Sequence, residues 1–385
     1  MTILVAVVVA LFAMEAVAWI LSVVSARYLS IPTPNRRRFL AEQSAMVGRW
    51  ISEPARRERL HATLGWEYRP GFESDTDHVN AQGLRATREY TLDPPPGVVR
   101  VAAFGDSYVY CNEVSDADTW PAVIERRWQA EVLNFGVGGY GPDQALLRLK
   151  AGAAQFMPRV VVLGITPMMI PRVVSRYRRF QDPRDGPWFK PRFVLNNEVL
   201  TAVRAPITSR EDAERLLVIP GAVTEYGRDD YWYNRALFEH VLYPWSATYR
   251  LAACLWLGLR RRYFHPDRIN RNGGLNMDSE ALKITVRIGR ECADVARSFG
   301  AELLILLLPG KEDVNAYTHH RRPSYERLHA HFAELGLRVV DVGRVLSSAS
   351  IPVANLFAQG GHYSVRGNAI VAEAVAASLG LATRA

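Results

Sequence analysis

A serine hydroxyl follows a run of small and β-branched apolar residues in the stretch VVRVAAFGDSYVYCNEV, residues 98–114. A strand that ends in Gly105-Asp106-Ser107 can turn sharply into a helix and leave the Ser107 hydroxyl at the carboxyl edge of a sheet. Open α/β sheets bind their ligands at that edge, so Ser107 is a candidate nucleophile. Asp and Ser are also ordinary N-cap residues, and the same tripeptide fits a plain strand-to-helix turn.

A serine nucleophile needs a base that removes its proton and N–H donors that face the oxyanion. The sequence contains candidates for both. The glycine-rich stretch NFGVGGYGPDQ, residues 134–144, lets a backbone N–H approach an anion closely. The stretch GGHYSVRGN, residues 360–368, places His362 in a loop before the last expected helix. We therefore expect His362 to be the base.

The elements that must position these residues alternate between strand and helix from Val98 onward. Nearly all-apolar strands are expected at residues 98–104, 131–136, 159–165, 301–309 and 337–343, with helices between them. Strands of this kind form a parallel sheet that helices cover on both faces. The pattern predicts one layered α/β domain whose strand ends bring Ser107 and His362 to the same edge.

The blocks around Ser107, residues 134–144 and His362 resemble, in their order and spacing, the SGNH/GDSL hydrolase superfamily. VNAQGLR at 79–85 and PGKEDV at 309–314 fit as well, so the resemblance covers roughly Asn80 to Leu379 without an insertion. It implies a three-layer flavodoxin-like sandwich with a five-stranded parallel sheet in the order 2-1-3-4-5. It also implies that Ser107 is the nucleophile and first oxyanion donor, that Gly139 is the second donor, and that His362 is the general base.

Two positions depart from the family pattern. Met168 or Met169 stands where the family supplies an oxyanion Asn, and Gln359 stands where an Asp three residues before the His is usual. Gln359, through its carbonyl, and Asp341, at the end of the fifth strand, are the candidate orienters of His362, although Asp341 also fits a helix N-cap. Losing one oxyanion donor costs about 10²–10³ in rate and losing a triad acid about 10⁴. A Ser–His dyad with two backbone donors would therefore still work slowly.

The amino terminus, residues 1–26, is expected to be a membrane anchor. Thr2 to Val24 is apolar apart from Thr2, Glu15 and Ser22, and is long enough to cross a bilayer at ~1.5 Å per residue. A cleaved signal peptide is the alternative, with small residues near Val24 but no Lys or Arg before the apolar run. Eight Arg against three Glu from residue 27 to 59 favour a cytoplasmic globular part. Membrane-anchored members of the resembling family favour an extracytoplasmic one.

Between the anchor and the predicted hydrolase domain, residues 27–95 are expected to be a basic juxtamembrane linker. It contains a helix that lies on the membrane surface or is simply solvated. The domain itself covers 96–385 and has an insertion at about 173–276, a lid or platform beside the site. Within this insertion we expect a β-hairpin that turns at Asn196-Asn197 and an aromatic-rich helical stretch from about 229 to 262.

Charge and composition narrow the partners. The formal net charge is +8, and much of the positive charge lies beside the apolar segment. This position favours membrane lipid as a partner. No stretch of the sequence resembles a nucleic-acid-binding motif. Three scattered cysteines predict neither a disulfide framework nor a zinc site, and His319, His320, His329 and His331 lack metal-ligand spacing. We expect no cofactor and no metal. Tyr140 and Tyr363 flank the expected pocket and are candidate substrate contacts, and Lys311 to Asp313 caps a helix or lines the cleft.

Two functions remain open from the sequence. One is a serine esterase, acyl hydrolase or O-acyltransferase that acts through an acyl-enzyme on Ser107, with an acetylated glycan as the substrate that the resemblance suggests. The other is a catalytically impaired SGNH-like protein that binds glycan or scaffolds an assembly, for which Met169 and Gln359 are the grounds. A nucleotide-binding flavodoxin-like module is disfavoured, because no glycine-rich phosphate cradle of the right form follows the first strand.

Overall fold

A computed structural model describes residues 1–28, 36–53, 55–240, 242, 245–265 and 267–384. The chain divides into two compact units. The helical unit comprises Met1–Pro54, Ser175–Lys190 and Pro206–Arg268, and the sheet unit comprises Ala55–Val174, Pro191–Ala205 and Ile269–Ala385. Residues 55–95, expected within a linker, therefore lie in the sheet unit, while the start of that linker, residues 29–35, lies outside the described residues.

Five parallel strands form the centre of the sheet unit. They are β5 (Val99–Phe104), β6 (Ala130–Asn134), β7 (Val160–Ile165), β12 (Glu302–Leu307) and β13 (Arg338–Asp341). Their order across the sheet is β13-β12-β7-β5-β6. Numbered along the chain and read from the β6 edge, this order is 2-1-3-4-5, which confirms the expected topology. All five carboxyl ends consequently lie on one edge of the sheet.

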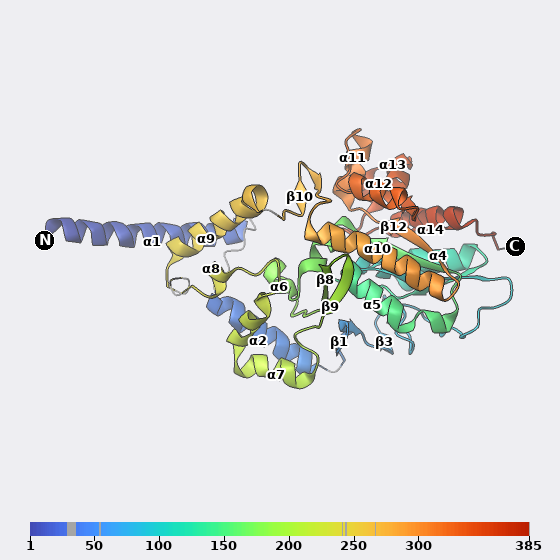
Figure 1. The fold of residues 1–385 in the computed structure, drawn as a ribbon, viewed down its shortest axis with the longest axis horizontal. Helices are drawn as coiled ribbons and strands as arrows, with labels where there is room; N and C mark the ends of the chain where they lie inside the picture. Colours follow the sequence, from blue (N-terminus) through green and yellow to red (C-terminus); the bar gives the residue numbers. More distant parts are fainter. Residues whose placement is uncertain (29–35, 54, 241, 243–244, 266, 385) are drawn as a thin grey trace. The chain divides into compact units, whose positions relative to one another are not determined.

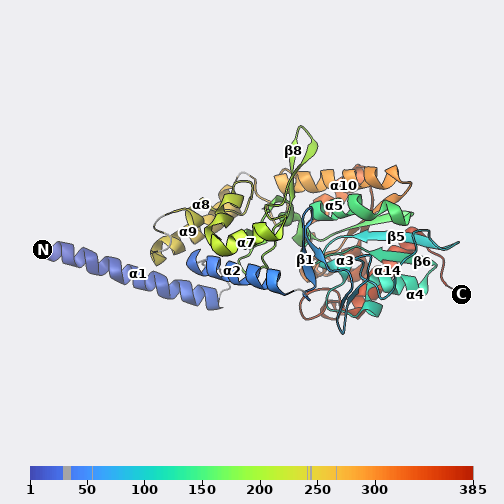
Figure 2. The same ribbon diagram turned by 90° about the horizontal axis from the view of Figure 1, so that it is seen from below.

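Helices cover both faces of this sheet, which confirms the three-layer sandwich (Figures 1 and 2). One face carries α4 (Trp120–Arg127), α11 (Lys311–Thr318), α13 (Val342–Ser348) and α14 (Val365–Leu379). The other carries α5 (Pro142–Gly152), α10 (Glu280–Ser298) and α12 (Glu326–Glu334). Strand and helix side chains such as Val162, Leu306 and Val371 are fully buried between the layers. Burial of apolar surface of this kind is the main force that holds such layers together.

Short elements surround the sandwich. They are β1 (Glu58–His61), β2 (Gly65–Tyr68), β3 (Phe72–Glu73), β4 (His78–Val79), α3 (Ser107–Tyr110), η1 (Asp116–Asp118), η2 (Ala154–Phe156), η3 (Pro167–Val174), β8 (Arg192–Asn196), β9 (Val199–Val203), β10 (Asn270–Arg271), β11 (Gly274–Leu275) and η6 (Val353–Leu356). The expected hairpin is present as β8 and β9, but Asn196 pairs with Val199. The turn is therefore Asn197-Glu198, whose positive φ values of 49° and 63° suit a two-residue hairpin loop.

The helical unit contains α1 (Thr2–Tyr28), α2 (Arg36–Ser52), α6 (Arg178–Gln181), α7 (Arg210–Val218), η4 (Pro220–Gly227), α8 (Arg235–Phe238), α9 (Ala247–Leu259) and η5 (Arg260–Phe264). Helix α2 is the expected basic juxtamembrane helix, but it packs against α7 and η4. Its apolar residues Phe39, Val47 and Trp50 are buried in protein. The apolar face of α2 is therefore covered by protein and is not free to enter a membrane surface.

Helix α1 stands apart from that packing. Its segment Thr2–Val24 is 23 residues long with a mean hydropathy of 2.6, and only 6% of its most apolar window is buried. Among the described residues it is the one helix that is long and apolar enough to cross a membrane. A bilayer span and a signal sequence both fit these properties.

Candidate active site

The turn that carries Ser107 is fixed by the carboxylate of Asp106. Asp106 is the N-cap of α3, and its Oδ1 accepts a hydrogen bond of 3.0 Å from the backbone N–H of Tyr108. Its Oδ2 accepts from the Thr166 hydroxyl and from the Arg172 guanidinium, both at 3.0 Å. Asp106 is fully buried, so these charged hydrogen bonds tie the start of α3 to the end of β7. Ser107 is thereby held at the carboxyl edge of the sheet, as predicted.

Ser107 and His362 meet at that edge despite their distance in sequence. The Nε2 atom of His362 lies 2.8 Å from Oγ of Ser107, within hydrogen-bond reach of a base and its nucleophile. On the other side of the ring, Nδ1 lies 2.6 Å from Oε2 of Glu113. The side chains of His362 and Glu113 are 22% and 26% exposed, so the arrangement is open to a substrate. Ser107, His362 and Glu113 thus have the geometry of a serine–histidine–acid triad.

Glu113 holds the backbone of the histidine loop as well as the ring. Its Oε2 accepts the N–H of His362 at 2.9 Å, and its Oε1 accepts the N–H of Gly360 at 2.5 Å. Burial raises the pKa of Glu113, but the hydrogen bonds from His362 and Gly360 outweigh it, so the pKa is lowered from its ordinary value. The charged carboxylate therefore stabilises the folded site above the ordinary carboxyl pKa, and this contribution is lost as the pH falls through the lowered value.

Asp341 and Gln359, which the sequence offered as residues that orient His362, are not the partners of its Nδ1 atom. Asp341 is the N-cap of α13, where it accepts the backbone N–H of Arg344 at 3.2 Å. It also accepts the hydroxyls of Tyr317 and Tyr325, so its oxygens are engaged elsewhere. Gln359 lies in the correct loop, but Nδ1 of His362 is directed to Glu113. The structure corrects both expectations, because the carboxylate that pairs with His362 is Glu113, six residues after Ser107, instead of a residue before the histidine.

Glu113 reaches the histidine because of an unusual turn after α3. Cys111 and Glu113 both have positive φ, 66° and 71°, which non-glycine residues adopt seldom. The guanidinium of Arg85 is almost completely buried and contacts the backbone of this turn. It donates to the carbonyl oxygens of Tyr110 and Cys111 at 2.6 Å and to that of Val114 at 2.7 Å. Arg85 thus satisfies carbonyls on both sides of Glu113 and fixes the direction of its side chain.

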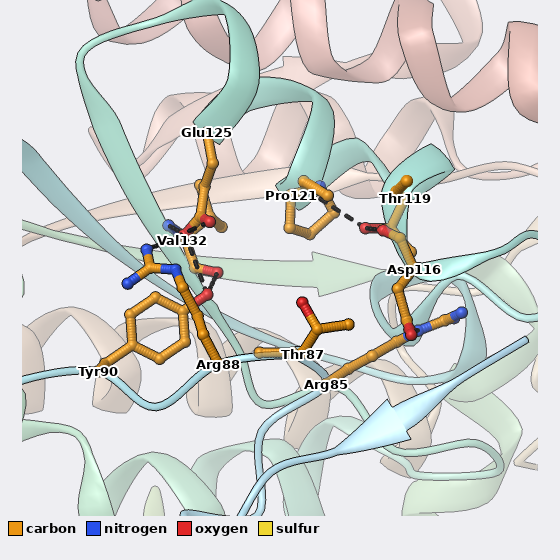
Figure 3. Close-up of a pocket in the computed structure, with 12 residues that line it drawn as sticks. Arg85, Thr87, Arg88, Tyr90, Asp116, Thr119, Pro121, Glu125 and Val132 are labelled. Atoms are coloured by element: carbon orange, nitrogen blue, oxygen red, sulfur yellow. Dashed lines mark hydrogen bonds and ion pairs between the residues drawn. The ribbon is translucent and has the colours of Figure 1, made fainter. Parts of the chain in front are cut away.

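Figure 3 shows the cavity of about 160 Å³ that Arg85 lines together with Asp116 and Arg88. Nε of Arg85 donates to Asp116 at 2.9 Å, and Arg88 pairs with Glu125 and Glu131. The charges in this cavity are therefore matched within the fold. We infer that the residues of this cavity stabilise the turn that carries Glu113.

Substitution Arg85→Lys is expected to lower kcat by about 10–100-fold with little change in KM, because misplacing a catalytic group by about 1 Å has this effect. A lysine keeps the charge, but its single ammonium nitrogen cannot replace the two terminal nitrogens with which Arg85 reaches carbonyls on both sides of Glu113. The check is the hydrolysis of p-nitrophenyl acetate at a temperature where circular dichroism shows both proteins folded. Arg88→Lys, in the same cavity but 47% exposed, is the matched control and should keep the parent kcat. Equal kcat values for the two variants would contradict the positioning role.

The glycine-rich loop, residues 134–144, contains Gly139, the second oxyanion donor that the family resemblance implies. Gly139 has a φ of +81°, and the preceding residue Gly138 is held between two aromatic side chains of β2. The Trp66 indole donates to the Gly138 carbonyl at 3.2 Å, and the Gly138 N–H donates to the Tyr68 hydroxyl at 2.8 Å. The β1–β2 hairpin therefore sets the orientation of the peptide that precedes Gly139. This support was not foreseen from the sequence, which assigned the segment to a linker.

A side chain at Gly136 would collide with α3, because a Cβ there would lie 2.4 Å from the backbone nitrogen of Tyr110. The glycine loop and the nucleophile helix are therefore in close backbone contact. The N–H groups of Ser107 and Gly139 remain the oxyanion donors that the family resemblance implies.

Tyr140 and Tyr363, the expected substrate contacts, are instead buried parts of the scaffold. The Tyr140 hydroxyl donates to the Trp66 carbonyl at 2.6 Å, and the Tyr363 hydroxyl donates to the Pro309 carbonyl at 2.8 Å. Tyr108 has a role that the sequence did not show. Its hydroxyl donates to the carbonyl of Gly361 at 2.9 Å, and its ring centre lies 5.1 Å from that of His362. Burial raises the pKa of Tyr108, which keeps the hydroxyl protonated as a donor to the histidine loop.

The two methionines at the missing-amide position differ in environment. Met169 is fully buried, whereas Met168 is 54% exposed. The nearest polar group along the chain, the Thr166 hydroxyl, donates to Asp106. The segment after β7 therefore supports the turn that carries Ser107 through Asp106, and neither methionine side chain can donate a hydrogen bond. Further along, Asp313 in α11 accepts the N–H and hydroxyl of Ser324, so this part of the 311–313 segment is structural.

No protein-family model and no curated protein sequence matches the chain. Solved structures that are similar to it include a protein described as lipolytic and of the G-D-S-L family from Desulfitobacterium hafniense, with 14% identity, a TM-score of 0.36 and coverage of 73% of this chain and 99% of that one. A lipase/acylhydrolase from Enterococcus faecalis has 12% identity and a TM-score of 0.34, over 75% and 100% of the two chains. TesA has 12% identity and a TM-score of 0.32, over 73% and 97%. At this level of similarity, activity must be argued from the site itself.

Proposed function

We propose that this protein is a serine acyl hydrolase of the SGNH/GDSL type that cleaves esters through an acyl-enzyme on Ser107. The observation that carries the proposal is the position of one imidazole ring. His362 lies 2.8 Å from the Ser107 hydroxyl on one side and 2.6 Å from the Glu113 carboxylate on the other. A ring placed in this way can take the hydroxyl proton on one nitrogen while the carboxylate fixes the proton on the other.

The reaction follows from these positions. Oγ of Ser107 attacks the ester carbonyl carbon while Nε2 of His362 takes the hydroxyl proton, and the carbonyl oxygen becomes an oxyanion facing the N–H groups of Ser107 and Gly139. The carbon–oxygen bond to the alcohol then breaks, and His362 returns the proton to the leaving alkoxide. Water repeats the sequence on the acyl-enzyme, which releases the acid and restores Ser107. Glu113 remains charged throughout and stabilises the imidazolium that forms twice in each cycle.

The finer features of the proposal concern the acceptor and the location. The resemblance to membrane-anchored SGNH proteins suggests an acetylated glycan as substrate. A sugar hydroxyl in place of water would make the reaction an O-acyl transfer, because either oxygen nucleophile can deacylate Ser107. We also propose that α1 anchors the enzyme in a membrane. The apolar length of α1 and its low burial support this part of the proposal.

A fluorophosphonate probe tests the proposal directly, because it labels serines that an adjacent base activates. The full chain in detergent should be labelled, and Ser107→Ala should abolish the label. Ser348→Ala, which removes an exposed hydroxyl in α13, is the matched control and should be labelled as strongly as the parent. A folded parent protein that takes no label would overturn the hydrolase and leave the glycan-binding or scaffold function suggested by the sequence.

A further inference from the structure

Helix α9 consists almost entirely of apolar residues, but other parts of the protein cover only one side of it. Of its 13 residues only Arg250 is charged, and Arg250 is 9% exposed. Leu255, Trp256 and Leu259 are 57%, 58% and 50% exposed. A helix that is apolar all round is normally covered by protein or by lipid. The exposed side of α9 has no such cover among the described residues.

The exposed residues of α9 form one continuous face. Ala252, Leu255, Trp256 and Leu259 are exposed at the spacing of successive helical turns, and the face continues to Tyr263 in η5. Ala247 and Arg250, which lie off this face, are buried. Such a stripe is a regular surface without a protein partner among the described residues.

The neighbour of α9 identifies what covers this surface. Helix α9 packs along α1, the helix that is apolar and exposed enough to span a bilayer. Glu15 of α1 accepts hydrogen bonds from the Ser246 hydroxyl at 3.0 Å, from the Thr248 N–H at 3.2 Å and from the Ala247 N–H. These contacts satisfy the first N–H groups of α9 and the oxygens of an otherwise costly intramembrane carboxylate. Figures 1 and 2 show α9 leaving α1 part of the way along its length.

The lengths agree with a location in one leaflet. Glu15 precedes Val24, the end of the apolar segment, by nine residues, which is about 14 Å of helix. This is close to half of a hydrocarbon core of about 30 Å. Helix α9 runs from that level toward the carboxyl end of α1 and is about 20 Å long. It is followed by exposed Arg260 and Arg262, residue types that favour anionic headgroups at the interface.

We propose that α9 enters the lipid bilayer beside the carboxyl-terminal half of α1, with its exposed apolar face against the acyl chains and Arg260 and Arg262 at the headgroups. Glu15 joins the two helices inside the membrane. This inference rests on the proposal that α1 spans a membrane, and it requires that α1 is retained, since cleavage after the apolar segment would remove the cap of α9. With 13 residues, α9 is too short to cross a bilayer by itself.

Fluorescence in vesicles tests this location on the full chain. In a Cys254→Ala background, where Cys111 and Cys292 are buried, single cysteines at three exposed positions would carry an NBD label. They are Trp256→Cys in α9, Phe12→Cys in α1 as the membrane standard, and Val218→Cys in α7 as the matched control outside α1 and α9. In phosphatidylcholine–phosphatidylglycerol vesicles, doxyl-labelled lipid should quench most of the emission at positions 12 and 256 and little at 218.

The NBD label at position 256 also tests the role of Glu15. Adding Glu15→Ala to the labelled Trp256→Cys protein should shift its emission to the red and reduce quenching, because α9 loses its link to α1. Quenching at position 12 without quenching at 256 would overturn the inference while leaving the anchor intact. Absence of quenching at both positions would overturn the anchor as well. Fluorophosphonate labelling of the same samples reports separately on the proposed hydrolase.

Discussion

Substitution His362→Ala should lower kcat for p-nitrophenyl acetate by about 10⁶, the loss that follows removal of the histidine in a serine triad. The imidazole is placed to take the Ser107 proton and to return it to the leaving group, so both half-reactions lose their proton carrier. Steady-state kinetics and the burst of p-nitrophenol would measure this effect. The double variant Ser107→Ala/His362→Ala should be no slower than either single variant, since residues that act as one unit are not additive.

The matched control is His319→Ala, which removes an exposed imidazole in the turn after α11. It should retain the parent kcat. A His362→Ala variant that keeps more than about a tenth of the activity would show that another group activates Ser107, because loss of a true general base costs at least about 10². It would also show that the 2.8 Å contact is not the reactive one.

Glu113→Gln should lower kcat by about 10⁴, because an amide in place of the triad acid can hold the imidazole in the wrong tautomer. The substitution preserves size and removes the charge that faces Nδ1 of His362. The decrease should appear in kcat and kcat/KM alike, since the lost interaction strengthens when the imidazolium forms. Kinetics with p-nitrophenyl acetate, together with thermal unfolding to confirm the fold, are the measurements.

Gln359→Ala distinguishes the acid seen in the structure from the one expected by family spacing. Gln359 lies in the same loop as His362, but Nδ1 of His362 is paired with Glu113. Removal of the Gln359 side chain should therefore change kcat by less than tenfold. If Gln359→Ala were the more damaging of the two variants, the acid would have to be reassigned. A charge restored at the family position by Gln359→Asp should not rescue Glu113→Gln unless the loop rearranges.

The sheet and the meeting of Ser107 with His362 could be predicted because both depend on simple regularities. Runs such as residues 159–165 and 301–309 are too apolar for anything but buried strands, and parallel strands bring their carboxyl ends to one edge. The acid could not be predicted in the same way. Its position depends on positive φ at Cys111 and Glu113, residue types that carry no such signal, and on carbonyl contacts with Arg85. Within the sequence, the only available signal was a carboxylate in the same loop as the nucleophile.

Helix α2 shows a different limit of the sequence. Its amphipathic pattern correctly indicated a helix with one apolar side, but periodicity does not say what covers that side. The apolar side of α2 packs against α7 and η4, which lie far along the chain, and Phe39 and Trp50 are buried. The same pattern of reasoning failed for Tyr140, where proximity to a loop suggested substrate contact and the structure shows a buried hydroxyl bonded to Trp66. Tertiary partners decided both cases.

The turn from Ser107 to Glu113 also bears on how such proteins can be recognised. In the proposed triad, the nucleophile Ser107 and the acid Glu113 lie on one short segment, and His362 comes from a loop far along the chain. Surveys that require an aspartate just upstream of the histidine would discard sequences built in this way as inactive. A search for Gly-Asp-Ser followed six positions later by a glutamate would recover them, and an enzyme with this layout could exchange its histidine loop without losing its acid.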